Sequence, residues 1–482
     1  MKNPTSQIRS LAPIRADVDA AAVVDHLHSS ALGVYHRNHC LIRLTQDTSF
    51  WNPANDPTPS RLAVFVHEYL HFVHNFSTVA GLYDFVAQLR LLRPFCNTVR
   101  ADGRSVGGNV LDSETRREIA AILKWRTHLR GGTVPQIKSA LGRKIAHPPF
   151  LRFRYEEHEV KIASQSIPCV GVVVTFDGSA LSVSDIPVEI SLGSEVLMEG
   201  CAVEAECIVL ERTGGSADQV RACVTAYPYL TARSIFEGIT GVSPSSKFLC
   251  CVCVLALQST NPGEAFIKLA NASKPEGEKM HLDEDALLAR FLANTSAFFN
   301  QRIEAILTQM MPLEIAPFEL RGHAGRGLKR MLDWGIALFE CRLEDSFFEF
   351  DALDKLPDLA PLVALLRSMP VCPVIQEVDT ADNDEEIIFF SEQEMPASVM
   401  DEIGAAQSLL HFASTHLRQD GVILETPDVK NRPCFFSKAC QAPLAKEKSI
   451  ICKQTPWEAF APSSGNGCWY ALGVAAARAL MA

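Results

Sequence analysis

The sequence lacks any apolar run long enough to span a membrane. Its most apolar stretch, FLCCVCVLAL at 248–257, has ten residues, whereas a helix that crosses a bilayer needs about 20. We therefore expect this stretch to be buried core, and we expect no membrane contact. The N-terminal residues also lack the continuous apolar segment of an export signal.

Positive charge is also scarce. The chain has 45 Lys and Arg against 56 Asp and Glu, a net charge of −11. Neutralising the phosphates of a nucleic acid requires clustered Lys and Arg, and attraction to an anionic lipid surface has the same requirement. We therefore do not expect the protein to bind nucleic acid or membranes. The basic residues at 113–145 have mixed spacing, which predicts two short helices with a solvated basic face; substrate or partner docking is the alternative.

The cysteines show no disulfide or zinc-finger pattern. Their number, 15, is odd, so they cannot all pair within one chain. Without an export signal we expect reduced thiols and a cytoplasmic protein. Zinc sites made of thiolates usually contain a closely spaced pair. The four cysteines of the C-terminal tail are separated by 5, 11 and 15 residues, so we expect ordinary thiols at Cys434, Cys440, Cys452 and Cys468.

Internal repeats, a Walker lysine motif and a Gly-x-Ser-x-Gly elbow are also absent, which excludes solenoids and gives no support to nucleotide or serine-hydrolase chemistry. Helical patterns cover most of the chain. The stretch VGVVVTFDG at 170–178 predicts strands joined by a tight turn at Asp177-Gly178. The expected fold class is therefore α+β, predominantly α-helical.

One segment carries recognisable chemistry: RLAVFVHEYLHFVHNF at 61–76. Residues four apart share a helix face, so His67 and His71 can direct their imidazoles at one point. Most other positions are apolar, which predicts a buried helix, and buried polar groups need partners. The spacing His-Glu-x-x-His is typical of zinc metallopeptidases, in which the glutamate activates water. We therefore predict His67 and His71 as zinc ligands and Glu68 as general base.

His74 continues the same stripe of the helix. It is displaced from His67 by ~10.5 Å of helix rise, too far for both to reach one ion easily. We expect His74 to be a packed core residue or, alternatively, a residue that orients a metal ligand.

A third ligand must come from another element. The segment LMEGCAVEAE at 197–206 predicts an apolar helix that contains Glu199. Small residues would let this helix approach the metal helix, namely Gly200, Cys201, Ala202 and Ala205. Glu237 in SIFEGITG is the alternative ligand. Glu195 or Glu206 could accept a hydrogen bond from a zinc-bound histidine.

At these residues the chain resembles the gluzincin-type zinc metallopeptidases, which combine a two-histidine helix with a glutamate on a later helix. The resemblance lies in HEYLH and in EGCAVEAE. It implies that His67, His71 and Glu199 bind Zn²⁺, that Glu68 is the catalytic base and that the core is zincin-like. The 128 residues from His71 to Glu199 (199 − 71) exceed the interval in compact members, so the segments between would be an insertion.

A donor that stabilises the oxyanion is also expected in such a peptidase. Tyr227 and Tyr229 in AYPYL are the candidates, with packing roles as the alternative.

These observations predict two regions. Residues 1–300 form a zincin-like catalytic region with a metal helix at 61–80, either as one long helix or as two that meet near Gly81. A third-ligand helix spans 194–212, and a β-rich insert lies at about 150–190. Residues 301–482 form a C-terminal helical and cysteine-containing extension, which has no identified chemistry and offers a surface for a partner protein.

The predicted function is zinc-dependent hydrolysis of peptide bonds in a polypeptide substrate. Two alternatives remain: a non-catalytic binding or scaffold protein with a zincin-like fold, and a nonpeptidase zinc hydrolase.

Overall fold

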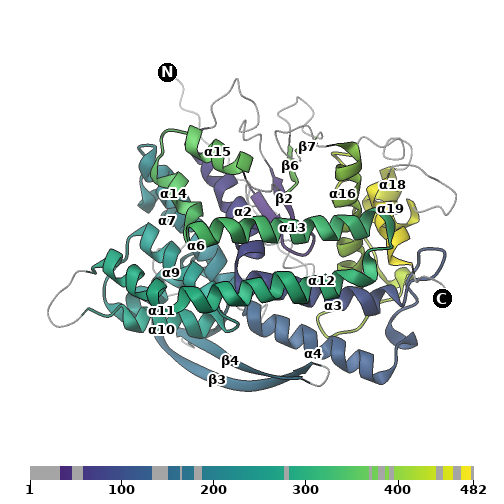
Figure 1. The fold of residues 1–482 in the computed structure, drawn as a ribbon, viewed down its shortest axis with the longest axis horizontal. Helices are drawn as coiled ribbons and strands as arrows, with labels where there is room; N and C mark the ends of the chain where they lie inside the picture. The colour runs from purple at the N-terminus through teal and green to yellow at the C-terminus, as the bar shows by residue number, and fades with distance from the viewer. Residues whose placement is uncertain are drawn as a thin grey trace.

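The computed structural model describes residues 33–45, 58–132, 150–162, 165–177, 187–275, 282–368, 372–377, 386–389, 396–440, 449–459 and 468–478. Within these ranges the chain is predominantly helical and contains two small sheets (Figure 1). This confirms the predicted α+β class with a predominance of helix.

The α-helices of the described ranges lie between residues 59 and 477. In order they are α2 (Pro59–Ser77), α3 (Val79–Cys96), α4 (Ser113–Arg130), α6 (Ser194–Arg212), α7 (Ala217–Cys223), α8 (Thr231–Thr240), α9 (Ser246–Leu257), α10 (Pro262–Ala272), α11 (Glu284–Ala305), α12 (Met311–Ile315), α13 (Gly322–Glu344), α14 (Phe348–Asp354), α15 (Ala360–Ser368), α16 (Ala397–His416), α18 (Ser449–Gln454) and α19 (Trp469–Ala477). Short helical turns include η2 (Ala226–Leu230), which precedes α8. None of the helices in the described ranges combines the length and the apolar character needed to cross a membrane.

The first sheet has the strand order β1-β2-β6-β7. Its strands are β1 (Gly33–His36), β2 (Leu41–Leu44), β6 (Val374–Glu377) and β7 (Glu386–Phe389). Strand β2 pairs in parallel with β6, and the other two pairs are antiparallel. Segments from both predicted regions, 1–300 and 301–482, therefore share one sheet.

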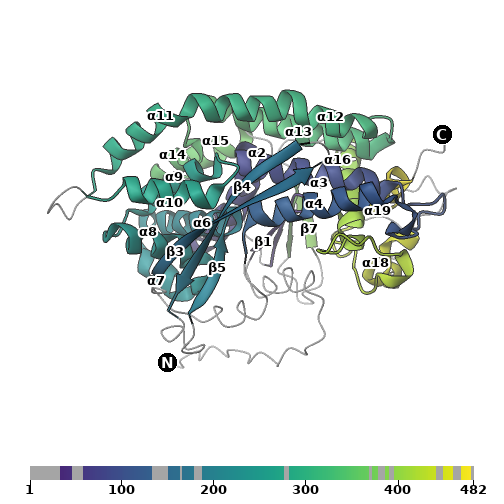
Figure 2. The same ribbon diagram turned by 90° about the horizontal axis from the view of Figure 1, so that it is seen from below.

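The second sheet is antiparallel and occupies the segment for which the sequence predicted β structure. It consists of β3 (Phe150–Ile162), β4 (Gln165–Phe176) and β5 (Val188–Leu192) in that order, and Figure 2 shows β3 and β4 as a long ribbon that runs diagonally in front of the helices. The predicted tight turn at Asp177-Gly178 lies partly outside the described residues, because Gly178 is not among them. In the described part of the chain, Phe176 pairs with Val188, so 11 residues (188 − 176 − 1) separate β4 from its partner β5.

The predicted metal helix is α2, and it starts earlier than 61. Thr58 caps it, accepting a hydrogen bond from the Arg61 amide at 3.4 Å, and Pro59 occupies its first turn. The helix stops at Ser77, and Thr78 caps α3 by accepting from the Gly81 amide at 3.1 Å. The predicted stretch 61–80 is thus divided between two helices that meet at Thr78, three residues before Gly81.

Apolar residues around α2 hold it in the centre of the fold. Phe65, Phe72 and Phe76 are fully buried. Trp334 of α13 packs on Phe72 and Phe76, with ring centroids 5.5 and 5.7 Å apart, and α13 crosses in front of α2 in Figure 1. Helices α3 and α6 and strand β1 contact the remaining faces. Such complete packing limits the positions that the polar side chains of α2 can adopt.

Helix α4 differs from the predicted solvated basic helix. Arg116, Arg117 and Lys124 are exposed as expected. Arg126 and Arg130 instead turn inward to the buried carboxylate of Asp84, at 2.9 and 2.7 Å. The prediction is wrong for these two residues, because a buried carboxylate needs cationic partners.

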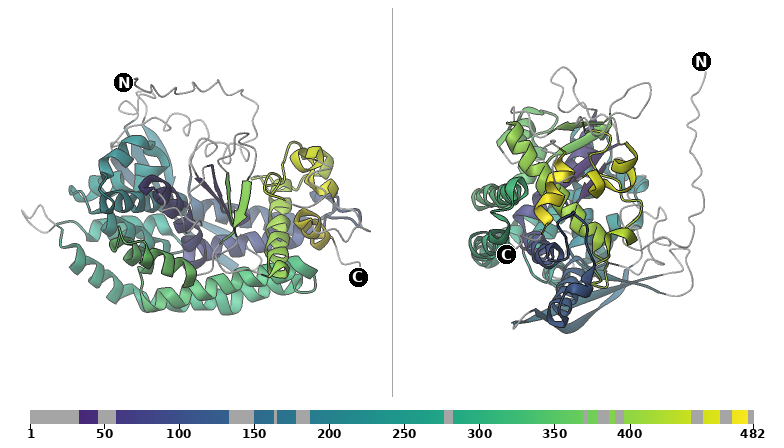
Figure 3. Two further views of the ribbon diagram at one scale, coloured as in Figure 1. Left: turned by 90° about the horizontal axis from the view of Figure 1, so that it is seen from above. Right: turned by 90° about the vertical axis from the view of Figure 1, so that its right-hand side faces the viewer.

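The C-terminal helices gather at one end of the molecule, where α18 and α19 are drawn in yellow (Figure 3). Helix α16 packs between α13 and α19. Among the described residues, no three of the C-terminal cysteines place their sulfur atoms within 4.8 Å of one another.

Candidate metal centre

The structure brings His67, His71 and Glu199 together. Helix α2 supplies the two histidines and α6, whose bounds agree with the predicted 194–212, supplies the glutamate. Glu199 Oε2 lies 3.2 Å from His67 Nε2 and 3.3 Å from His71 Nε2. One ligand atom from each residue lies within 4.8 Å of the other two. The three side chains predicted as zinc ligands therefore lie next to one another.

These separations fit the ligand sphere of zinc. Zn²⁺ binds imidazole nitrogen at about 2.0–2.1 Å and carboxylate oxygen at about 2.0–2.2 Å, so a tetrahedral site places neighbouring ligand atoms about 3.4 Å apart. The two measured nitrogen–oxygen distances are close to that value. The side chains of His67, His71 and Glu199 are only 8%, 10% and 13% exposed, so the group is largely shielded from water.

Glu206, one of the two predicted orienting residues, contacts the other side of the His67 ring. Its Oε1 lies 2.5 Å from His67 Nδ1. When Nδ1–H donates to Glu206, the Nε2 lone pair faces the Glu199 carboxylate. Two acceptor atoms 3.2 Å apart repel each other unless a proton or a cation lies between them. The arrangement is the carboxylate–histidine pair that orients metal-bound imidazoles.

The charges around His67 also favour a cation at this position. Burial opposes protonation of His67, but the carboxylates of Glu206 and Glu199 outweigh it and hold the pKa of His67 well above its usual value. Burial likewise opposes ionisation of Glu199, yet His71 and His67 outweigh it and hold the pKa of Glu199 well below its usual value. The site thus favours a carboxylate anion and a positive charge beside it.

Glu68, the predicted base, is 6% exposed and lies beside strand β1. A Cβ atom added to Gly33 would come within 2.7 Å of Glu68 Cγ and 3.0 Å of its Oε1. Gly33 therefore provides the space that Glu68 occupies. Two residues further on, the ring of Tyr35 stacks on His71 with centroids 6.4 Å apart. Strand β1 thus runs directly alongside the histidine–glutamate motif.

Of the two candidate tyrosines, Tyr229 lies at the site. Its ring is 6.0 Å from that of His67, in a T-shaped arrangement, whereas Tyr227 belongs to the hydrophobic core. Gly200 makes this approach possible: a Cβ there would lie 2.9 Å from Ala232 Cβ and 3.6 Å from the Tyr229 carbonyl oxygen. The small residue at 200 therefore accommodates η2 and α8, and not α2 as predicted.

The remaining acidic candidates have other partners. Glu237 accepts hydrogen bonds from Ser243 Oγ at 2.6 Å and from Arg233 at 3.3 Å. Glu195, one turn before Glu199, acts electrostatically on Arg37 and Arg130. Glu199 and Glu206 are thus the acids of α6 that face the histidines.

His74 does not join the group. It is fully buried, and its Nε2 lies 3.4 Å from Glu349 Oε1. This is the packed core position that the sequence favoured.

Comparison with models of known protein families gave no match, and neither did comparisons with curated proteins and with solved structures. The assignment of a function therefore depends on the residues and their geometry.

Proposed function

We propose that the protein is a zinc-dependent peptidase with a zincin-like core, in which His67, His71 and Glu199 bind Zn²⁺ and Glu68 is the general base. The observation that carries this proposal is the placement of two imidazole nitrogens and one carboxylate oxygen at ligand spacing, next to a buried glutamate on the same helix. We also propose a cytoplasmic location, where the thiols would stay reduced.

A bound Zn²⁺ supplies a Lewis acid that polarises the scissile carbonyl and acidifies water. Glu68 accepts the proton of the attacking water, a role that requires an ionised carboxylate next to the metal ligands. His67 and Glu68 are consecutive in α2 and point about 100° apart around the helix, so His67 would bind the metal while Glu68 lies toward β1. With Nδ1–H donated to Glu206, Nε2 is the ring nitrogen of His67 that would bind the metal in place of a proton.

Tyr229 is the proposed oxyanion donor. Burial, followed by the carboxylates of Glu199 and Glu68, raises the pKa of Tyr229. The phenol therefore keeps its proton at neutral pH and can donate to a negatively charged oxygen.

Strand β1 supports a polypeptide substrate. In the described part of the chain it pairs with β2 only and forms one end of the sheet. An edge strand offers backbone donors and acceptors to an extended peptide. Because Gly33 and Tyr35 of this strand contact Glu68 and His71, a peptide that lies along β1 would place its carbonyl groups near the metal ligands.

The test uses the full chain loaded with zinc and compares wild type with Glu68→Gln on a peptide library and on an unfolded polypeptide. We expect cleavage by wild type and a loss of roughly 10²–10⁴ in the variant, with equal zinc content. Glu211→Gln, at an exposed position of α6, is the matched control and should cleave normally.

The other possible outcomes support different functions or mechanisms. Zinc binding without cleavage by either protein favours the binding or scaffold alternative. Hydrolysis of small esters or amides without peptide cleavage favours a nonpeptidase zinc hydrolase. Equal cleavage by wild type and Glu68→Gln removes Glu68 from the mechanism.

A further inference from the structure

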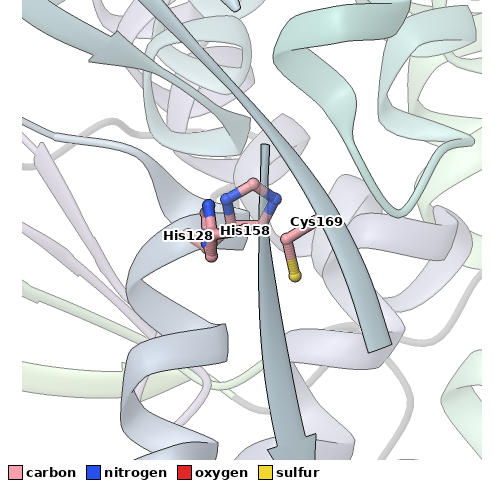
Figure 4. Close-up of side chains that lie close together, drawn as sticks. All are labelled: His128, His158 and Cys169. Carbon is pink, nitrogen blue, oxygen red and sulfur yellow. The ribbon is translucent and has the colours of Figure 1, made fainter. Parts of the chain in front are cut away.

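A second group of metal-ligating side chains lies between helix α4 and the β3–β4 ribbon. His128 comes from the last turn of α4, His158 from β3 and Cys169 from β4. One ligand atom from each lies within 4.8 Å of the other two. Figure 4 shows the two imidazoles next to each other and the Cys169 thiol beside them; the rings are 4.7 Å apart and nearly perpendicular, at 83°.

Strand pairing and helix packing together produce this group. His158 and Cys169 are direct partners in the antiparallel register of β3 and β4, so their side chains share one face with Cβ atoms about 4.5–5.5 Å apart. Helix α4 contacts β3 and brings His128 to the same face. Cys169 is 2% exposed, while both histidines are half-buried, which leaves one side of the group open to solvent.

The hydrogen bonds of Asn261 fix the proton on His128. The Val170 amide donates to Asn261 Oδ1 at 3.1 Å, which identifies that atom as the carbonyl oxygen. His128 Nε2 lies 3.0 Å from the same oxygen and therefore carries hydrogen and donates. In the neutral imidazole the lone pair is then on Nδ1. A backbone or side-chain carbonyl that accepts from one ring nitrogen is the usual support of a metal-bound histidine.

We propose that His128, His158 and Cys169 bind a Zn²⁺ ion, separate from the one at His67 and His71, and that water completes its coordination on the open side. Two imidazoles and a thiolate suit Zn²⁺, whereas Mg²⁺ and Ca²⁺ prefer oxygen ligands. The ion would fasten the β3–β4 ribbon to α4. This proposal is independent of peptidase activity.

Local electrostatics agree with metal-linked proton release. Burial lowers the pKa of His128 against the opposing hydrogen bond to Asn261, and His158 adds to the lowering. Burial raises the pKa of Cys169, although the charge of Lys124 opposes this. The thiol would therefore lose its proton when the metal binds.

The test is a Co²⁺ titration of the metal-free full chain, followed by absorption. A cobalt–thiolate bond gives a near-ultraviolet charge-transfer band, which a site of nitrogen and oxygen ligands such as His67, His71 and Glu199 lacks. We expect a band with the intensity of one cobalt–thiolate bond per chain, however much Co²⁺ the His67–His71 site also takes up, and we expect it to disappear in Cys169→Ser. The band should persist in His71→Gln, and also in Cys440→Ser, the control for the C-terminal thiols.

A second variant decides the outcome if Cys169→Ser does not fold. His158→Gln keeps every thiol but removes one ligand, so the Co²⁺ affinity of the band should fall by at least roughly tenfold. The proposal is overturned if wild type shows no band, if the band survives in Cys169→Ser, if it is lost in Cys440→Ser, or if His158→Gln titrates like wild type.

Discussion

Glu206 and His67, which are 139 residues apart in the sequence, meet through Oε1 and Nδ1 at 2.5 Å. The contact joins α6 to α2 on the side of the imidazole that faces away from Glu199. Helix α6 therefore supplies both Glu199, a proposed metal ligand, and Glu206, which orients the proposed ligand His67. The metal affinity should therefore depend on Glu206 even though Glu206 is not a ligand.

Replacing Glu206 by Gln should weaken zinc binding by roughly 10–100-fold, because the amide is a poorer acceptor for Nδ1–H and can present its NH₂ group instead. Competition with a chelator measures the affinity. Glu211→Gln, on the same helix and exposed, should bind zinc like wild type. An unchanged affinity in Glu206→Gln would mean that the Glu206 contact does not support the metal.

Tyr229→Phe should lower kcat by roughly 10²–10³ without loss of zinc, since the variant removes only the hydroxyl that would donate to the oxyanion. Steady-state kinetics on a cleaved peptide, together with metal analysis, measure both quantities. Tyr227→Phe is the matched control in the core and should keep the wild-type kcat. A Tyr229→Phe enzyme with normal kcat would assign Tyr229 to packing.

Asp84→Asn should destabilise the fold by about 3–5 kcal/mol, because it leaves Arg126 and Arg130 without their buried anion. Arg37 shares the same carboxylate at 3.1 Å. Urea denaturation measures the free energy of unfolding. Asp218→Asn removes an exposed pair with Arg221, in which the Asp side chain is 93% exposed, and should cost less than about 1 kcal/mol. Equal effects of the two variants would contradict the role of the buried cluster.

The buried pair Arg342–Glu349, at 2.8 Å, predicts a loss of stability in acid. Burial opposes ionisation of Glu349, but Arg342 and His74 outweigh it and lower the pKa of Glu349 from 4.5 to about 2. Because the folded-state pKa is depressed, the stabilisation is complete above about pH 4.5 and disappears as the pH falls toward 2. It amounts to on the order of 3 kcal/mol.

Urea denaturation of wild type and Glu349→Gln at pH 6, 5, 4 and 3 measures this contribution. The difference between the two proteins should be constant from pH 6 to 5 and should shrink below pH 4.5. A difference that does not change with pH would exclude Glu349 as the titrating group.

The histidine pair of α2 could be predicted because helical periodicity alone places His67 and His71 on one face. Glu199 could be selected because a carboxylate inside an apolar helix requires a partner. The choice between Glu195 and Glu206 depends on how α6 crosses α2, and sequence spacing does not encode that angle. The same limit applies to Tyr229, whose position depends on the close packing of η2 on Gly200.

The features that the sequence did not predict depend on contacts between residues far apart in the chain. From the sequence, Arg126 and Arg130 are expected to be surface charges, because their pairing with Asp84 depends on how α4 packs. His158 and Cys169 become neighbours only through the register of β3 and β4, and His128 joins them from a helix that precedes both strands. No short sequence motif predicts this group of His128, His158 and Cys169, because the three residues come from three different elements.

The most direct test of the central claim is an anomalous difference map, measured at the zinc absorption edge, from crystals of the zinc-loaded chain. If His67, His71 and Glu199 bind zinc, the map contains a peak about 2.0–2.2 Å from His67 Nε2, His71 Nε2 and a Glu199 oxygen. Zinc-loaded crystals without a peak among these three atoms would contradict the proposed zinc site.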